Sequence, residues 1–489
     1  MKSPDVGSLL PKAPRILSAL LVLLLLVSPL LVGCGSNVDA GRTDPPASAA
    51  SPSDTSGPAA EPSEPRAGDD WPRFLGPGQD GKSRETGIVT DWSGGLKILW
   101  QTEIGEGYSA PVTADGRLFL FDRIDDTARL RALDSSTGAE LWSQTYPTAY
   151  EDMYNYSGGP RTSPVVDGER VFIFGVDGRL QARQVTDGAL LWEVDTEAAY
   201  GVVQNFFGVG STPTIHDGLL IVQVGGSPEG SPGIQSGNVQ PDGSGIVAFD
   251  LADGTERYRF GDYLASYSSI VTAEQDGKPR AFTLTRGGLV VFDPAEGEEV
   301  AFVPWRARKL ESVNAATPVV VGNRVFITES YGPGGALVEI PVEISGDGEA
   351  ARMVWQDGRR EKSIESHWAT PIHVDGFVYG SSGQSRGNGE LRAVELDTGR
   401  VVWKQKGLER VSLLYVDGHF VVLGESGELR LVKADPTAYV EVASWRPEDE
   451  DGKALLRFPA WSAPILSRGV LYVRGSDRLL ALELIPSGD

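Results

Sequence analysis

The sequence predicts an all-β fold, an eight-bladed β-propeller of four-stranded blades, from three observations. A segment of roughly fifty residues recurs eight times between 97 and 485, a period typical of propellers and solenoids. Each copy holds β-branched and aromatic runs separated by pairs such as Asp-Gly, which are hairpin signals. Almost no stretch of this region shows helical periodicity. Each unit therefore reads as four short antiparallel strands.

The first pair of strands in each unit is marked by an apolar run, a turn and a second apolar run. Asp-Gly pairs at 115–116, 167–168, 375–376 and 417–418 are expected to form several of these turns. The eight copies are YSAPVTADGRLFL (108–120), RTSPVVDGERVFI (161–173), GSTPTIHDGLLIV (210–222), YSSIVTAEQDGKPRAFTL (267–284), AATPVVVGNRVFI (315–327), WATPIHVDGFVYG (368–380), VSLLYVDGHFVVL (411–423) and WSAPILSRGVLYV (461–473).

A second pattern, ALDSSTGAELW at 132–142, recurs near the end of the units and predicts a corner. The glycine occupies the place where a tight turn needs positive φ. A leading aspartate can accept the N–H groups of that turn, and a closing tryptophan can pack against the next blade. We expect a structural corner here rather than a catalytic site. The positions are Gly138, Gly188, Gly254, Gly297 and Gly399; Asp134, Asp250 and Asp293; and Trp142, Trp192 and Trp403.

Closure of the ring is predicted from the two ends of the repeat region. The last unit ends at ALEL (481–484) without a fourth strand, and KILWQTEIG (97–105) stands before the first unit without partners. We expect the strand at 97–105 to complete the eighth blade, with Trp100 in the packing position, because closure protects exposed sheet edges.

The N-terminal region predicts export and a lipid anchor. Basic residues precede an apolar run that ends in Leu31-Val32-Gly33-Cys34, which resembles the lipobox of bacterial lipoproteins; an uncleaved membrane helix is the alternative. Cys34 is the only cysteine, so internal disulfides are excluded. We expect a signal peptide over 1–34 with lipidation of Cys34, a disordered tether over 35–70, an N-terminal extension over 71–96 and the propeller over 97–485.

Charge and anchor together narrow the location and the partners. The net charge of −23 argues against nucleic acid and against docking of the folded part on an anionic membrane. The expected location is the cell envelope, on the periplasmic side. Gly35 after the lipidated cysteine resembles lipoproteins of the outer membrane. We expect a monomer that touches the membrane only through its lipid.

The corner pattern Asp-x-x-x-Gly-x-x-x-Trp resembles the PQQ-like propeller repeat over roughly 97–485. That repeat is shared by quinoprotein dehydrogenases and by the BamB lipoprotein family of outer-membrane assembly factors. The segment WPRFLGPGQDG (71–81) is similar to the opening of PQQ-like repeat proteins of planctomycete-type bacteria. PQQ and calcium are the cofactors that the quinoprotein resemblance implies, but the adjacent-cysteine disulfide of many quinoproteins is absent and we identify no Glu, Asn and Asp set for calcium.

A binding site is expected on the face that carries the long connections, such as 143–162, 193–211 and 226–245. The crossovers bring the residues before each inner strand to the central axis, where they would either hold an anionic or sugar-like ligand or simply plug the channel. These candidates are Tyr108, Arg161, Tyr267, Asn314, His367, Trp368, Arg410 and Trp461. Six aromatic residues would form a protein-binding rim or pack the loops: Tyr146, Tyr150, Tyr154, Tyr156, Phe206 and Phe207.

These observations predict a lipid-anchored, non-enzymatic binding or scaffold protein of the cell envelope, similar to BamB. The expected partner is an envelope protein or a glycan. The alternatives are a PQQ-dependent quinoprotein-like oxidoreductase and a carbohydrate-binding propeller. No catalytic residue and no metal ligand is assigned.

Overall fold

The computed structural model describes residues 61–487 except 313 and 342–349. The predicted signal peptide, Cys34 and residues 35–60 of the predicted tether lie outside this part of the chain. No helix within the described ranges is long and apolar enough to cross a membrane.

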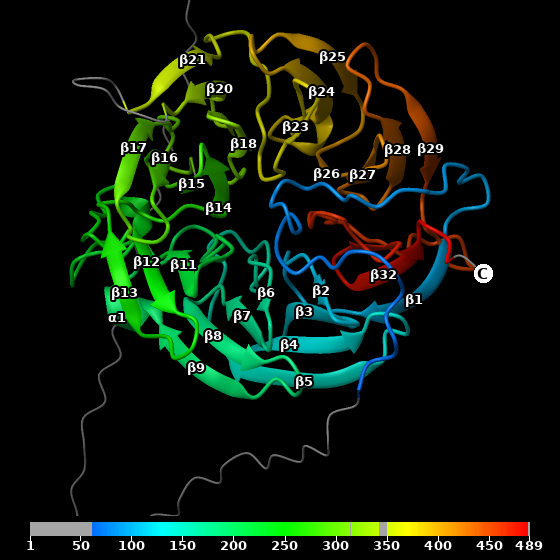
Figure 1. Ribbon diagram of the computed structural model, residues 1–489, viewed down its shortest axis with the longest axis horizontal. Helices are drawn as coiled ribbons and strands as arrows, with labels where there is room; N and C mark the ends of the chain where they lie inside the picture. The colour runs from blue at the N-terminus through cyan, green and yellow to red at the C-terminus, as the bar shows by residue number, and fades with distance from the viewer. Residues whose placement is uncertain (1–60, 313, 342–349, 488–489) are drawn as a thin grey trace, which may run out of the picture. The chain divides into compact units, whose positions relative to one another are not determined.

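The described chain forms eight antiparallel four-stranded sheets arranged around a ring (Figure 1), which confirms the predicted eight-bladed propeller. Each blade runs from an inner strand near the axis to an outer strand at the rim. Blades 1 to 4 contain β2 (Val112–Ala114), β3 (Arg117–Ile124), β4 (Thr127–Asp134) and β5 (Glu140–Pro147); β6 (Val165–Asp167), β7 (Arg170–Phe174), β8 (Arg179–Gln184) and β9 (Leu190–Asp195); β10 (Thr214–His216), β11 (Leu219–Gln223), β12 (Ile246–Asp250) and β13 (Glu256–Phe260); β14 (Val271–Gln275), β15 (Lys278–Leu284), β16 (Gly288–Phe292) and β17 (Glu299–Pro304).

Blades 5 to 8 follow the same plan, and the last blade takes its outer strand from the beginning of the repeat region. They contain β18 (Val319–Val321), β19 (Arg324–Glu329), β20 (Gly334–Glu339) and β21 (Arg352–Gln356); β22 (Ile372–Val374), β23 (Phe377–Ser382), β24 (Glu390–Glu395) and β25 (Val401–Lys406); β26 (Val411–Val416), β27 (His419–Gly424), β28 (Leu429–Lys433) and β29 (Glu441–Trp445); β30 (Ile465–Ser467), β31 (Val470–Arg474), β32 (Arg478–Glu483) and β1 (Lys97–Glu103). β1 pairs antiparallel with β32, with Trp100 opposite Ala481.

Helical structure is confined to loops on the described chain. α1 (Thr196–Tyr200) begins at Asp195, whose side chain accepts a hydrogen bond from the Ala198 N–H, and ends at Gly201 in the left-handed region. Two short 3₁₀ turns are η1 (Ile234–Ser236) and η2 (Arg386–Asn388).

The corner pattern joins one blade to the next. Gly188 has φ +73°, and a Cβ there would also lie 2.7 Å from the Trp142 ring of the preceding blade. Trp142 donates its indole N–H to the Val185 carbonyl across the same junction at 2.9 Å. The glycine is therefore needed both for the turn and for the neighbouring tryptophan. The same contact recurs as Trp100 with Gly138, Trp192 with Gly254, Tyr258 with Gly297 and Trp355 with Gly399.

The N-terminal extension closes the channel on the face that carries the short turns. Its residues 71–83 cross this end of the ring and form hydrogen bonds with blades on several sides of the axis. Gln79 bonds to Thr214 of blade 3 and to Thr272 of blade 4, and the backbone around Gly81 pairs with Tyr415 of blade 7. We call residues 71–83 the strap; Figure 1 shows this blue segment reaching the middle of the ring.

Residues 61–70, the end of the predicted tether, are described and contact the propeller. Arg66 forms an ion pair with Glu483 at 3.0 Å, and Asp70 forms one with Arg468 at 2.8 Å. This stretch therefore continues the strap toward blade 8.

Candidate functional site

Seven of the eight candidate residues line one cavity of about 250 Å³. Residues from the crossover into the inner strand of every blade contribute to its wall, so the cavity lies on the central axis. Phe74 and Leu75 of the strap also line it, which makes it a pocket with its floor on the short-turn face. The seven residues are Tyr108, Arg161, Tyr267, His367, Trp368, Arg410 and Trp461.

Asn314 is the candidate that the structure places elsewhere. It is buried, its backbone is left-handed at φ +48°, and its amide donates to the carbonyls of Thr285 and Trp305. Asparagine tolerates this conformation and satisfies two carbonyls of blade 4. Asn314 therefore holds the crossover between blades 4 and 5 and is not part of the cavity lining.

Aromatic rings form a continuous chain around the cavity. Trp461 and Trp368 have centroids 5.0 Å apart, and Tyr108 lies 4.9 Å from Trp461. The chain of contacts runs through Tyr267, Phe207, Tyr156, Trp461, Trp368, His367 and Tyr331. Such walls suit a flat, uncharged group, because aromatic faces stack with rings at these separations.

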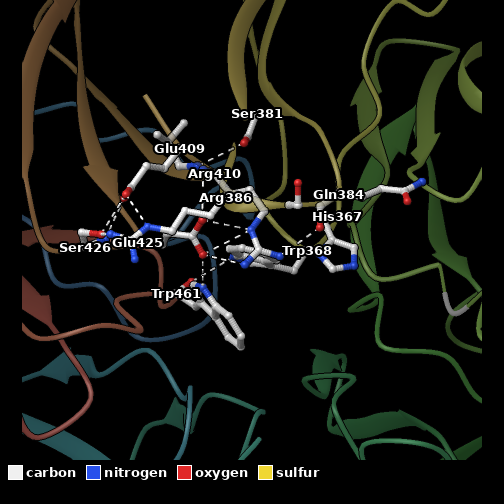
Figure 2. Close-up of polar contacts among 12 residues, drawn as sticks. His367, Trp368, Ser381, Gln384, Arg386, Glu409, Arg410, Glu425, Ser426 and Trp461 are labelled. Carbon is white, nitrogen blue, oxygen red and sulfur yellow. Dashed lines mark hydrogen bonds and ion pairs between the residues drawn. The ribbon is translucent and has the colours of Figure 1, made fainter. Parts of the chain in front are cut away.

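Arg410 is held in this wall by a buried carboxylate (Figure 2). Its guanidinium donates to both oxygens of Glu425, with Nη2 to Oε2 at 2.6 Å and Nε to Oε1 at 3.1 Å, and Glu425 is fully buried. The Trp461 indole N–H donates to the same carboxylate at 2.9 Å. Burial opposes ionisation of Glu425, but the hydrogen bonds from Arg410 and Trp461 outweigh it and keep its pKa below the usual value. The Arg410 guanidinium also stacks on Trp368 at 4.4 Å.

The contacts of His367 determine its protonation state. Arg410 Nη1 lies 3.1 Å from His367 Nδ1, and an arginine can only donate, so Nδ1 carries the lone pair. The proton is then on Nε2, which donates to the Tyr331 hydroxyl at 2.9 Å. Burial, and next the charge of Arg410, lower the pKa of His367 to about 4. His367 is therefore neutral near pH 7, and the Tyr331 hydroxyl keeps its own proton to donate to a ligand.

Arg161, on the other side of the cavity, is also neutralised. It pairs with Asp152, whose side chain is 2% exposed, and donates to the carbonyls of Ser157 at 3.0 Å and Gly159 at 3.1 Å. Its guanidinium lies 5.6 Å from the Tyr108 ring centroid. Both cations of the site therefore organise loops and aromatic rings, and the cavity between them has no net positive charge.

The cavity does not fit PQQ with calcium. PQQ is a polyanion, and both cavity arginines already have buried carboxylate partners, Asp152 and Glu425. Within the described ranges, no three His, Cys, Asp or Glu side chains come together in a way that could hold a metal ion. The donor set favours an uncharged ring over an anionic cofactor.

The six rim aromatics divide into two groups. Tyr146, Tyr150 and Phe206 are buried and pack the loops onto the propeller, whereas Tyr154 and Tyr156 are 43% and 59% exposed. Phe207 is half-buried and contacts both exposed tyrosines, at 5.5 and 5.9 Å. Loop packing therefore accounts for the three buried rings, whereas a protein-binding rim at the exposed Tyr154 and Tyr156 stays a prediction.

Sequence reasoning missed the two carboxylates and the Tyr331 ring. Glu425 follows the apolar strand VVLG, and a charged residue directly after such a strand is a signal for a buried partner. Tyr331 follows Glu329 after the equivalent strand of blade 5. Phe207 was predicted for the rim, and the structure places it in the lining of the axial cavity as well.

Comparisons with known proteins agree with this architecture. The family model described as outer membrane protein assembly factor BamB matches residues 87–227 and 205–405. The crystal structure of BamB from Moraxella catarrhalis aligns with 79% of this chain and 97% of its own at 13% identity and a TM-score of 0.52. Quinohemoprotein alcohol dehydrogenase from Comamonas testosteroni aligns with 86% of this chain and 81% of its own at 12% identity and a TM-score of 0.59. At these identities the structural matches show the fold alone. No curated protein matches the chain by sequence.

Proposed function

Since this chain belongs to the PQQ-like β-propeller family represented by outer membrane protein assembly factor BamB, we propose that it is a non-enzymatic binding scaffold of the cell envelope. The scaffold works through the face that carries the long crossovers. One observation supports this most: the axial pocket has aromatic walls, two neutralised arginines and a floor made by the chain itself. A preorganised pocket of this kind can bind an anchor group without catalysing a reaction.

The anchor that fits best is an uncharged ring, such as a tyrosine or tryptophan side chain of a partner protein. Protein interfaces concentrate their binding energy in aromatic anchors that fill desolvated pockets. The exposed Tyr154 and Tyr156 extend the aromatic surface beyond the pocket, and the free proton of Tyr331 offers one directional hydrogen bond. A sugar ring shares the stacking chemistry, so a glycan that competes for the pocket would change the partner class.

The proposed location is the periplasmic side of the outer membrane, with the propeller attached through lipidated Cys34. Metabolic labelling with a radioactive fatty acid, in the full chain and in Cys34→Ala, tests the anchor. We expect label on the wild type and none on the variant; a wild type without label would show that Cys34 carries no lipid.

Site-specific photo-crosslinking in cells of the native host tests the scaffold. A crosslinking residue at Tyr156 is expected to capture one discrete envelope protein, and Trp461→Ala in the same chain should weaken that product. A matched position at Asp276, exposed in the β14–β15 turn on the opposite face, is the control. Equal products at both positions, or none at Tyr156, would contradict the proposal.

Cofactor retention tests the quinoprotein alternative. The soluble domain from Asp69 onward is incubated with PQQ and calcium and then desalted. We expect no retained quinone absorbance and no rise in melting temperature. Retention of the quinone would instead support the quinoprotein-like oxidoreductase.

A further inference from the structure

A second groove lies on the long-crossover face beside the axial pocket. It has a volume of about 810 Å³ and lies between the crossover after β17, the loop after β19 and the crossover after β21. Tyr331 lines both the pocket and this groove. The charged lining is strongly one-sided: it holds five cations and one carboxylate, namely Arg306, Arg308, Lys309, Arg359, Lys362 and Asp357. We call it the basic groove.

The cations of the basic groove have no carboxylate partner at salt-bridge distance in the described part of the chain. Among the described residues, none of the five cations forms an ion pair within 4 Å, although the chain as a whole carries −23. Asp357 is already engaged, since its Oδ2 accepts from Ser363 N at 2.8 Å and from Ser363 Oγ at 2.9 Å. Lys362 donates only to the carbonyls of Gly332 and Pro333. These cations are therefore available to a ligand.

One cation of the groove shares an acceptor with a further arginine that is not part of the lining. Arg306 and the buried Arg286 both donate to one carbonyl oxygen, that of Leu310, at 3.4 and 2.8 Å. Two guanidinium groups on one acceptor repel each other. An anion beside Arg306 would relieve that repulsion.

Apart from Gln356, the uncharged part of the lining is mainly apolar. Pro304, Trp305, Ala307, Tyr331 and Pro333 contribute to it, with Trp305 and Ala307 buried. A free phosphate is bound by donors that converge on one point, whereas these cations come from two separate crossovers. A bilayer surface would meet a broad charged face rather than a groove that leads to a blind pocket. Spread charge over an apolar floor fits an extended chain with acidic side chains.

We propose that the basic groove binds an acidic peptide segment of the partner protein. This inference rests on the proposed scaffold function and deepens it, because the segment would lie next to the anchor group in the axial pocket. The carboxylates would pair with Arg308, Lys309 and Arg359, and apolar side chains between them would contact Trp305 and Tyr331.

Fluorescence anisotropy with the domain from Asp69 onward tests peptide binding in the groove. The probe is a labelled glutamate-rich peptide with one tyrosine, and the matched probe has lysine in place of glutamate. Arg308→Glu/Lys309→Glu/Arg359→Glu is expected to weaken binding of the acidic probe on the order of tenfold or more. The matched control Lys278→Glu/Lys404→Glu/Arg446→Glu changes net charge equally at exposed residues without ion pairs and should leave affinity nearly unchanged. Binding by the wild type should also fall as salt rises from about 0.05 M to about 0.3 M.

Three results would overturn the inference. The groove variant binds the acidic peptide as the wild type does, the control variant loses as much affinity, or phosphatidylglycerol vesicles or inorganic phosphate bind in a groove-dependent way where the peptide does not. Melting temperatures of both variants establish that they fold. If the acidic peptide does not bind but crosslinking at Tyr156 persists, only the groove inference is wrong. If crosslinking at Tyr156 is also absent, the proposed scaffold function is wrong as well.

Discussion

The axial pocket and the basic groove share a wall at Tyr331 but use their cations in opposite ways. In the pocket, Arg410 and Arg161 pair with Glu425 and Asp152, which are almost completely buried. In the groove, Arg308 and Lys309 are exposed and have no carboxylate within 4 Å among the described residues. The paired cations therefore stabilise the wall of the pocket, whereas the unpaired cations of the groove are available to a ligand.

Breaking the Arg410–Glu425 pair should produce the largest effect. Arg410→Met leaves a buried carboxylate without its partner, and we expect a loss of about 3–5 kcal/mol in the free energy of unfolding. Urea denaturation of the soluble domain measures it. The double variant Arg410→Met/Glu425→Gln should recover much of the loss. Arg386→Met is the control, because its pair with Glu409 is 55% exposed on the arginine side and should contribute only about 0–1 kcal/mol.

The groups on either side of Tyr331 should give opposite dependences of stability on pH. Burial raises the pKa of Glu329 from 4.5 to about 7, so the folded state binds more protons and stability falls as the pH rises through that interval. The pKa of His367 is lowered from 6.5 to about 4, so stability falls as the pH falls through that interval. Each contribution is on the order of 3 kcal/mol, and the two largely cancel between about pH 4.5 and 6.5.

Replacing either Glu329 or His367 should reveal the pH dependence that the other residue contributes. Glu329→Gln should lose stability as the pH falls below 6.5 and should exceed the wild type at pH 8. His367→Gln can still accept from Arg410 and donate to Tyr331, and it should instead gain stability as the pH falls from 7 toward 4.5. Urea denaturation across this range measures both. Parallel pH profiles for the wild type and both variants would show that neither group titrates as stated.

Arg286 offers an intermediate case, because it is buried but bonds to neutral oxygens. It donates to Asn205 Oδ1 at 3.2 Å and to Leu310 O, and Arg286→Met leaves no carboxylate behind. We expect a loss of about 1–2 kcal/mol, smaller than for Arg410→Met. A loss equal to that of Arg410→Met would mean that the carboxylate partner is not what distinguishes the two sites.

Neutralising the groove should have the smallest effect on stability. Arg308→Gln/Lys309→Gln removes two exposed cations without partners, so the unfolding free energy should change by no more than about 0.5 kcal/mol. Thermal denaturation measures this change. A loss above about 1 kcal/mol would indicate that these side chains hold the fold rather than await a ligand.

The ring and its corners were predictable because they depend on local patterns. Turn glycines such as Gly138, and tryptophans such as Trp142, repeat at the same spacing in successive units. The cavity lining was predictable for the same reason, since each crossover enters its inner strand alike. The prediction that Asn314 lines the cavity was wrong, because its left-handed backbone turns the side chain toward blade 4.

The pair of Arg410 with Glu425 could have been derived from the sequence, because a two-residue turn at 417–418 places Val411 opposite Gly424 and therefore Arg410 beside Glu425. The groove could not be predicted in this way. Arg308 and Arg359 lie in separate crossovers and read as ordinary solvated charges. Their gathering on one face follows from the geometry of the ring, which no single unit encodes.

The strap has a consequence for the timing of folding. Residues 71–83 and β1 leave the ribosome before most of their partners exist, because the strap bonds to Tyr415 of blade 7 and β1 pairs with β32. The ring can therefore close only after translation has passed residue 483. Repeat arrays whose units contact only neighbours can fold from any point. In this propeller the first strand can pair only after the last blade has been made. A chain truncated within blade 8 would therefore have an open ring, and β1 would lack its partner strand.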